Sequence, residues 1–280
     1  MSESEIRETM PVRLVISDVD GTLIDGAKKL TDATIAAVKR LHEAGLHFTI
    51  SSARPAAGLR DFISALAITS PVSSFNGALI VLPDLTPIRS IPLQPEDVFA
   101  SAETVKQFGL DLWIYNARGW FVSRLDGPHV AHESTVTGIE PQQLENLQIC
   151  AEGSLKMVGV SDDHAVVAAC EVHLQHQSGL HISAIRSQDY YLDITNMNAN
   201  KGNAVLEFSD VLGIPASEIL TIGDMPTDVL MFRKSGTSIA MGNADEQVKA
   251  EATFVTRSNH EDGFAYAMSK FVLREESQVA

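Results

Sequence analysis

The stretch LVISDVDGTLIDG, residues 14–26, ends an apolar run in two aspartates, Asp18 and Asp20, one residue apart. Residues 14–16 are typical of a buried strand, which normally ends in neutral turn residues. An Asp-rich turn that hydrogen-bonds its own backbone is one interpretation. The other is a ligand site, because open α/β sheets bind ligands at the carboxyl ends of their strands. Two carboxylates there repel each other, and a divalent cation such as magnesium, which prefers oxygen ligands, would relieve that cost.

Strand and helix patterns alternate in two separate blocks of the chain. The first block has strands at 14–16, 46–51 and 72–82 and helices at 31–45 and 54–66, and it ends where Pro83, Pro87, Pro92 and Pro95 crowd together. The second block has helices at 201–213, 228–236 and 244–252 and strands at 219–223 and 237–242. Such alternation is typical of an α/β fold with a parallel sheet. We expect residues 1–84 and 196–280 to form the two parts of one core.

The middle of the chain, residues 85–195, has a different pattern. Its short strand candidates lie at 110–116, 119–125, 154–160, 179–185 and 190–195. Several neighbouring strands without long helices between them predict an α+β unit on a mainly antiparallel sheet. We therefore expect this segment to be a domain inserted into the core.

Composition limits the partners of the chain. Its 280 residues include 36 acidic and 21 basic side chains, which gives a formal net charge of -15. That charge opposes binding to duplex nucleic acid or to an anionic membrane, and no apolar run approaches the length of a membrane span. Cys150 and Cys170 have no disulfide or metal-site spacing, and the polar segment 1–10 lacks the features of a signal peptide. We expect a soluble cytoplasmic protein, either a monomer or a homodimer.

A second acidic group lies in TIGDMPTD, residues 221–228, between an apolar strand and a helix start. Asp224 follows its strand directly, as Asp18 follows the first strand, so both carboxylates could reach one cation. Asp228 has a second interpretation, because a carboxylate at a helix start caps free N–H groups and meets the positive end of the helix dipole.

Groups suited to bind an anion follow the second strand and begin a later helix. Ser51 and Ser52 end the strand, where a hydroxyl and the next backbone N–H can bind a phosphoryl oxygen, although a simple cap is the alternative. Lys201 stands at a helix start, which is the unfavourable end of the dipole for a cation. This placement favours a role in neutralising an anion.

Taken in order, DVDGT (18–22), SAR (52–54), KG (201–202) and GDMPTD (223–228) resemble the four motifs of the haloacid dehalogenase (HAD) superfamily. The position of the insert is similar to that of the C2 cap in the Cof-type subfamily, class IIB. The resemblance extends over about residues 12–272. It implies a Rossmann-like core with an inserted α+β cap, and the activity of a phosphoric monoester hydrolase, a phosphatase.

The resemblance also implies roles for individual residues. Asp18 would be the nucleophile that forms an aspartyl-phosphate, and Asp20 would act first as general acid and then as general base. Mg²⁺ would be bound by the Asp18 carboxylate, the Asp20 backbone carbonyl and Asp224, with Asp228 supporting the site. The residues expected to bind the phosphoryl group or the substrate are Val19, Ser52, Ala53, Asn76, Lys201 and Thr227.

Two motifs depart from the family pattern. Ser52 and Ala53 stand where the second motif usually has Thr and Gly, which keeps the hydroxyl but adds a methyl group beside the phosphate. Thr227 stands where the fourth motif usually has Asn, which shortens or removes an amide contact. We expect the change at Ala53 to be tolerated, and the change at Thr227 to affect the rate or the substrate preference but neither the nucleophile nor the metal ligands. Asn76, in FNGA (75–78), is either a polar substrate contact or part of a Gly-containing turn.

Three functions remain open at this point. The first is a magnesium-dependent phosphatase for a small phosphorylated metabolite, with sugar phosphates the class that the resemblance favours. The second is a phosphotransferase similar to phosphomannomutases, and the third is a non-catalytic sensor that binds a phosphorylated metabolite. A pure binder needs no nucleophile beside an acid, which disfavours the sensor. Candidates for the leaving-group side are Trp113, Tyr115, Trp120 and Arg124, although packing within the cap is the stronger interpretation.

Overall fold

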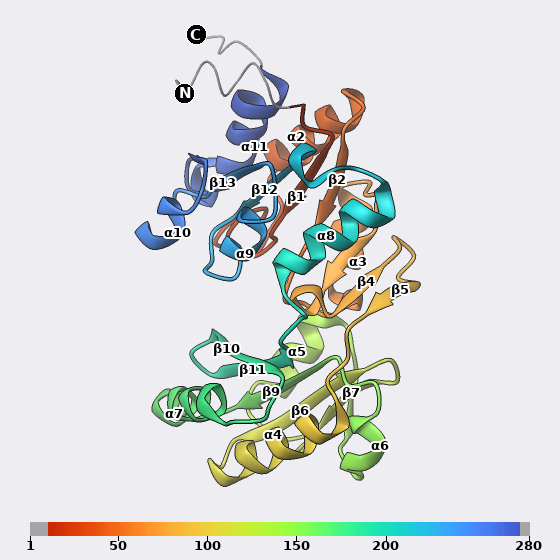
Figure 1. Ribbon diagram of the computed structural model, residues 1–280, viewed down its shortest axis with the longest axis vertical. Helices are drawn as coiled ribbons and strands as arrows, with labels where there is room; N and C mark the ends of the chain where they lie inside the picture. The colour runs from red at the N-terminus through yellow and green to blue at the C-terminus, as the bar shows by residue number, and fades with distance from the viewer. Residues whose placement is uncertain (1–10, 275–280) are drawn as a thin grey trace.

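Five parallel strands form the sheet at the centre of the core. In the computed structural model, which describes residues 11–274, their order is β14-β13-β12-β1-β2. Their bounds are β1 (Leu14–Ser17), β2 (His47–Ile50), β12 (Ile219–Gly223), β13 (Thr237–Ala240) and β14 (Phe254–Val255). The two blocks that flank the insert therefore share one parallel sheet, as predicted (Figure 1). The polar segment 1–10 lies outside the described residues.

Helices cover both faces of this sheet because its strands bury side chains on both sides. Val15 packs in one apolar cluster with α2 (Asp32–Glu43) and α11 (Gly263–Ala267). Its neighbours Leu14 and Ile16 pack in another with α8 (Lys201–Leu212), α9 (Val229–Phe232) and α10 (Glu246–Ala250). The short helical turns are η1 (Ala56–Leu59), η2 (Phe75–Gly77), η3 (Ala216–Glu218), η4 (Asn259–Glu261) and η5 (Met268–Leu273), and α3 (Arg60–Ala65) follows η1. In a sheet of this kind, ligands bind at the carboxyl ends of the strands, so the loops after β1, β2 and β12 are the expected place for a ligand site.

A second sheet of six strands forms the cap, in the order β10-β11-β9-β6-β7-β8. Its strands are β6 (Asp111–Asn116), β7 (Gly119–Val122), β8 (Pro141–Gln143), β9 (Lys156–Val160), β10 (Ile182–Gln188) and β11 (Tyr191–Asn196). All neighbours are antiparallel except β7 and β8, which confirms the prediction of a mainly antiparallel α+β unit. Figure 1 shows this sheet and its helices below the core.

The two faces of the cap sheet have different partners. One face packs in an apolar cluster with α4 (Pro95–Gln107), α6 (Leu147–Ala151) and α7 (His164–His176). The other contributes to a cluster that contains Trp113, Tyr115 and Trp120 from the cap together with Phe75 and Ala78 from the core side. Helix α5 (Val130–Thr137) also contributes Val130 to this cluster. The second face is therefore turned toward the core.

The segment 72–82 differs from its prediction as a single strand. It forms β3 (Val72–Ser74), the turn η2 and β4 (Leu79–Val81), which pairs with β3 and with β5 (Pro87–Ser90) in an antiparallel sheet. Phe75, Asn76 and Gly77 all have positive φ angles of 51°, 55° and 99°, which reverse the chain. The Gly-containing turn that was one interpretation of FNGA is therefore present, within a stretch that strand-like residues on both sides indicated as one strand. The limits of the inserted domain at residues 85 and 195 stay predictions.

Local interactions define both ends of α2, within the predicted helix 31–45. Thr31 accepts a hydrogen bond from the Thr34 N–H at the start of the helix, and Gly45, with φ of 76°, follows its end. The predicted helix 54–66 instead begins as η1 and becomes α-helical only at Arg60. Between residues 11 and 274, the structure contains no helix that is long and apolar enough to cross a membrane.

Candidate active site

Lys201 joins two carboxylates at the carboxyl edge of the core sheet. Asp18 directly follows β1, and its N–H donates to the Ile222 carbonyl of β12 at 2.9 Å. The Lys201 Nζ, at the start of α8, donates to Asp18 Oδ1 and to Asp228 Oδ1 at 2.6 Å each. All three side chains are buried, with exposed fractions of 6% or less. This position explains why a lysine stands at the unfavourable end of a helix dipole.

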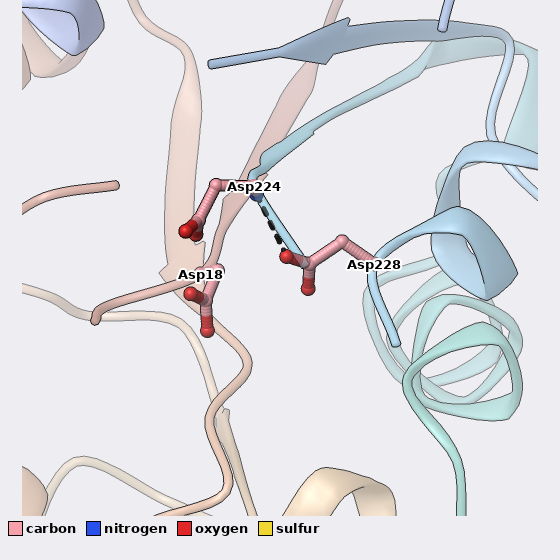
Figure 2. Close-up of side chains that lie close together, drawn as sticks. All are labelled: Asp18, Asp224 and Asp228. Atoms are coloured by element: carbon pink, nitrogen blue, oxygen red, sulfur yellow. Dashed lines mark hydrogen bonds between the residues drawn. The ribbon is translucent and has the colours of Figure 1, made fainter. Parts of the chain in front are cut away.

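Asp228 organises the turn that carries Asp224. Its Oδ2 accepts hydrogen bonds from the backbone N–H groups of Asp224 and Met225, at 2.9 Å each (Figure 2). These donors precede Asp228, so its carboxylate closes the β12–α9 turn and makes no capping bond to α9. The alternative interpretation of Asp228, as a side-chain cap of α9, is therefore wrong, and its carboxylate lies beside those of Asp18 and Asp224.

Asp224 is held by side chains from two other loops. The Thr22 hydroxyl donates to Asp224 Oδ1 at 3.0 Å, and Asn243 Nδ2 donates to Asp224 Oδ2 at 3.3 Å. Asn243 Nδ2 also donates to the Gly21 carbonyl at 3.0 Å, which ties the loop after β13 to the loop after β1. Sequence reasoning missed both partners, because Thr22 and Asn243 carry no local signal beyond their places after strands.

Three carboxylates here fit a divalent metal ion. Oxygens of Asp18, Asp224 and Asp228 lie within 4.8 Å of one another (Figure 2). Burial and the neighbouring Asp228 charge together raise the pKa of Asp18 well above its usual range and that of Asp224 to about 6. Burial acts to lower the pKa of Lys201, but the charges of Asp18 and Asp228 raise it above its usual range. The single positive charge of Lys201 compensates only part of the negative charge of the three carboxylates. Oxygen donors with uncompensated charge are the ligands that hard divalent cations prefer.

The Asp20 side chain binds two other basic residues, Arg54 and Lys28, and not Lys201. Arg54 binds its carboxylate through two hydrogen bonds, Nε to Oδ2 at 2.7 Å and a terminal NH₂ to Oδ1 at 2.8 Å. Lys28 Nζ donates to Oδ1 at 3.0 Å. Burial acts to raise the pKa of Asp20, but the bonds and charges of Arg54 and Lys28 outweigh it and lower the pKa to about 2. Sequence reasoning placed Arg54 in the second motif without this role.

The remaining predicted binding residues surround these carboxylates to different extents. Ser52 is buried after β2, and its Oγ accepts a hydrogen bond from the Arg54 N–H at 3.2 Å. The Asn76 N–H donates to the Ser52 carbonyl at 2.8 Å, which places the strained turn η2 beside the Ser52 loop. Val19 packs with its side chain in the core, so only its backbone can face a ligand. Thr227 lies in the turn between Asp224 and Asp228.

The cap candidates have three different environments. Trp113 and Trp120 are buried against each other in the cap's second face, as the packing interpretation predicts. Arg124 is exposed and pairs with Asp111 and Asp126. Tyr115 differs from these, because its ring contacts Phe75 of the core and its hydroxyl donates to Glu133 at 3.1 Å.

A family model described as haloacid dehalogenase-like hydrolase matches residues 15–268. A protein of Haemophilus influenzae that is named as a phosphatase is 28% identical over 262 residues, or 93% of this chain and 98% of its own. The pyridoxal phosphate phosphatase of Escherichia coli is 25% identical over 91% of this chain and 97% of its own. The solved structure of a HAD subclass IIB sugar phosphatase has a TM-score of 0.79 at 22% identity, covering 93% of this chain and 99% of that one.

The chain thus belongs to the haloacid dehalogenase-like hydrolase family. Within that family it is a phosphatase, with the HAD core and the α+β cap that the four motifs implied.

Proposed function

We propose that the protein is a magnesium-dependent phosphatase that hydrolyses a small phosphorylated metabolite through an aspartyl-phosphate on Asp18. The observation that carries this proposal is the Lys201 ammonium, which bridges buried Asp18 and Asp228 beside the third carboxylate, Asp224. Asp18, Asp224 and Asp228 would hold the metal ion with the Asp20 carbonyl, and the bound ion would neutralise charge on the phosphoryl group.

The side chains can divide the reaction into two displacements. Asp18 forms a bond to phosphorus while the ester P–O bond breaks, and Asp20 gives a proton to the departing oxygen. Asp20 then takes a proton from water, which attacks phosphorus, breaks the bond to Asp18 and releases phosphate. Ser52, the Ala53 N–H and Lys201 would bind the phosphoryl oxygens. Because Asp20 is ionised in its pairing with Arg54, we infer that it leaves Arg54 and takes up a proton from solvent before it acts as an acid.

The names of relatives support a small phosphorylated metabolite as substrate, since one is named for pyridoxal phosphate and a solved structure for sugar phosphates. A phosphomutase would use the same Asp18 chemistry but would pass the phosphoryl group to another hydroxyl. The measurement that separates the two is free phosphate, which a mutase releases only slowly.

The test is phosphate release from sugar phosphates and p-nitrophenyl phosphate, for the parent and for Asp18→Asn, with Mg²⁺ or EDTA. We expect release that requires Mg²⁺ and disappears in Asp18→Asn, while Glu171→Gln, at a half-buried pair with Arg186 on the cap, keeps the parent rate. Release that persists in Asp18→Asn would contradict the proposed nucleophile. Phosphorylated isomers without free phosphate would favour the mutase.

A further inference from the structure

A cluster of polar side chains lies on the face of the cap sheet that is turned toward the core. Tyr115 and Lys156 are direct neighbours across β6 and β9, and Asp193 lies on the adjacent strand β11. Lys156 Nζ lies 2.6 Å from Asp193 Oδ2, and Tyr115 donates to Glu133 Oε1 from α5. We call these four residues, Tyr115, Glu133, Lys156 and Asp193, the roof cluster. Charged residues inside the strands 156–160 and 191–196 were the sequence signal that could have revealed it.

The roof cluster contacts the loop that carries the candidate site. Lys156 Nζ donates across the interface to the Ala53 carbonyl at 3.4 Å, directly before Arg54. Tyr115 packs its ring on Phe75 with centroids 5.3 Å apart. Arg54, the residue after Ala53, binds the Asp20 carboxylate of the candidate site through two hydrogen bonds. A leaving group that extends from Asp18 toward the cap would meet this cluster.

The charge of the roof cluster restricts that leaving group. It contains two carboxylates and one ammonium, and Asp193 already lies beside the ammonium, so the four residues together carry one net negative charge. Asp193 and Lys156 are almost fully buried, with side-chain exposures of 6% and 10%. Asp193 Oδ1 accepts no hydrogen bond from the residues that the structure describes. Carboxylate oxygens are acceptors only, so a hydroxyl satisfies them, whereas a second carboxylate or phosphate would add an uncompensated buried charge.

We propose that the roof cluster is the leaving-group subsite and that it selects neutral, hydroxyl-bearing leaving groups over anionic ones. Glu133 and Asp193 accept hydroxyl groups of the leaving group, and Lys156 holds Asp193 in place and ties the subsite to the Ala53 loop. This inference rests on the proposed phosphatase function and adds to it the residues and the charge rule that set substrate preference.

The test compares sorbitol 6-phosphate with 6-phosphogluconate, which has the same carbon chain but a carboxylate in place of the terminal hydroxymethyl group. We expect kcat/KM to favour sorbitol 6-phosphate by about tenfold or more, the effect of roughly 1.4 kcal/mol. Glu133→Gln removes one charge and should reduce this ratio at least about threefold. Because the readout is a ratio, a general loss of activity cancels. Glu171→Gln, on the opposite face of the cap, should leave the ratio unchanged.

A parent ratio near one, or the same ratio in Glu133→Gln as in the parent, would overturn the proposal. p-Nitrophenyl phosphate tests the chemistry separately, because its hydrolysis by the parent shows an active phosphatase whatever the ratio is. If no ester is hydrolysed, the proposed function fails, and the subsite is then tested by binding. Calorimetric titration of both compounds into Asp18→Asn with Mg²⁺ should show tighter binding of sorbitol 6-phosphate, and equal binding would overturn the proposal.

Discussion

Lys201 is the residue whose loss the site tolerates least. It is the cation between buried Asp18 and Asp228, so its removal leaves two carboxylates without their shared partner. We expect Lys201→Met to lower the free energy of unfolding by about 3–5 kcal/mol, the usual cost of breaking a buried ion pair from one side. Urea denaturation in EDTA measures this loss.

The control for Lys201→Met is Lys249→Met. Lys249 pairs with exposed Glu246 at the protein surface, where an ion pair contributes about 0–1 kcal/mol. Equal losses in the two variants would show that Lys201 is not a special partner of these carboxylates.

Asp224 carries an energetic cost that a metal ion would remove. Its pKa of about 6, above the ordinary 3.8, means that the folded state binds the proton more tightly than the unfolded state. Ionised Asp224 therefore destabilises the fold above about pH 6, and this penalty is relieved as the pH falls from 6 toward 4. At roughly 1.4 kcal/mol for each pH unit, the penalty is on the order of 2–3 kcal/mol.

We expect Asp224→Asn in EDTA to melt a few degrees above the parent at pH 7.5, on the order of 3–8 °C. The difference should shrink toward pH 4, and added Mg²⁺ should raise the Tm of the parent more than that of the variant. Thermal melts at the two pH values measure both effects, with the exposed Glu140→Gln as control. A variant that melts below the parent at pH 7.5 in EDTA would contradict this explanation.

At the scale of elements, the turn η2 positions the start of α8. A Cβ on Gly77 would lie 2.5 Å from the Asn200 carbonyl oxygen, next to Lys201, and Gly77 also has a φ of 99°. Gly45 has a similar φ of 76° but nothing within 4 Å of its Cβ position. Substitution of Gly45 therefore tests backbone strain alone, whereas substitution of Gly77 tests backbone strain together with a steric clash.

We expect Gly45→Ala to cost about 1–2 kcal/mol from the left-handed backbone alone, measured by urea denaturation. Gly77→Ala should cost more, about 3 kcal/mol or above, because the Asn200 backbone must also move. Since that movement displaces Lys201, phosphatase activity should fall in Gly77→Ala even where the protein is fully folded. Equal stability losses and unchanged activity would show that η2 does not position α8.

Elements with one dominant local signal were predictable from the sequence. The apolar runs before Asp18 and Asp224 specified two neighbouring parallel strands, and the carboxyl ends of such strands bring those aspartates together. The sequence left the turn at Phe75 to Gly77 as one of two interpretations, because strand-like residues on both sides continue one pattern across three residues with positive φ angles. Partners from distant segments were missed, because the pairing of Lys156 with Asp193 depends on strand order in the cap, which no local pattern encodes.

At the scale of the whole molecule, core and cap share one apolar cluster. Phe75 and Ala78 pack there with Trp113 and Trp120, which are both tryptophans of the chain. Fluorescence therefore reports on the contact between the two units, while circular dichroism reports on the helices of both. We expect the two urea unfolding curves of the parent to coincide, as they do for cooperative units.

Phe75→Ala should shift both curves to lower urea by removing a shared aromatic side chain, at a cost of about 3 kcal/mol or more. Phe99→Ala is the control, since Phe99 is exposed on α4. Separate fluorescence and dichroism transitions in the parent would show that the cap unfolds independently of the core.

The central position of β1 also has a consequence for the newborn chain on the ribosome. β1 emerges first, yet its neighbour β12 begins only at Ile219, and the whole cap is translated between them. Until then the nascent polypeptide carries Asp18, the proposed nucleophile, without Lys201, Asp224 or Asp228, and one edge of β1 has no strand to bond. Such an edge is open to unwanted pairing, so chaperones that cover it during synthesis would protect the growing chain. We therefore expect enzymatic activity to appear only when the last third of the chain, which contains α8 and the strands β12, β13 and β14, emerges and completes the sheet.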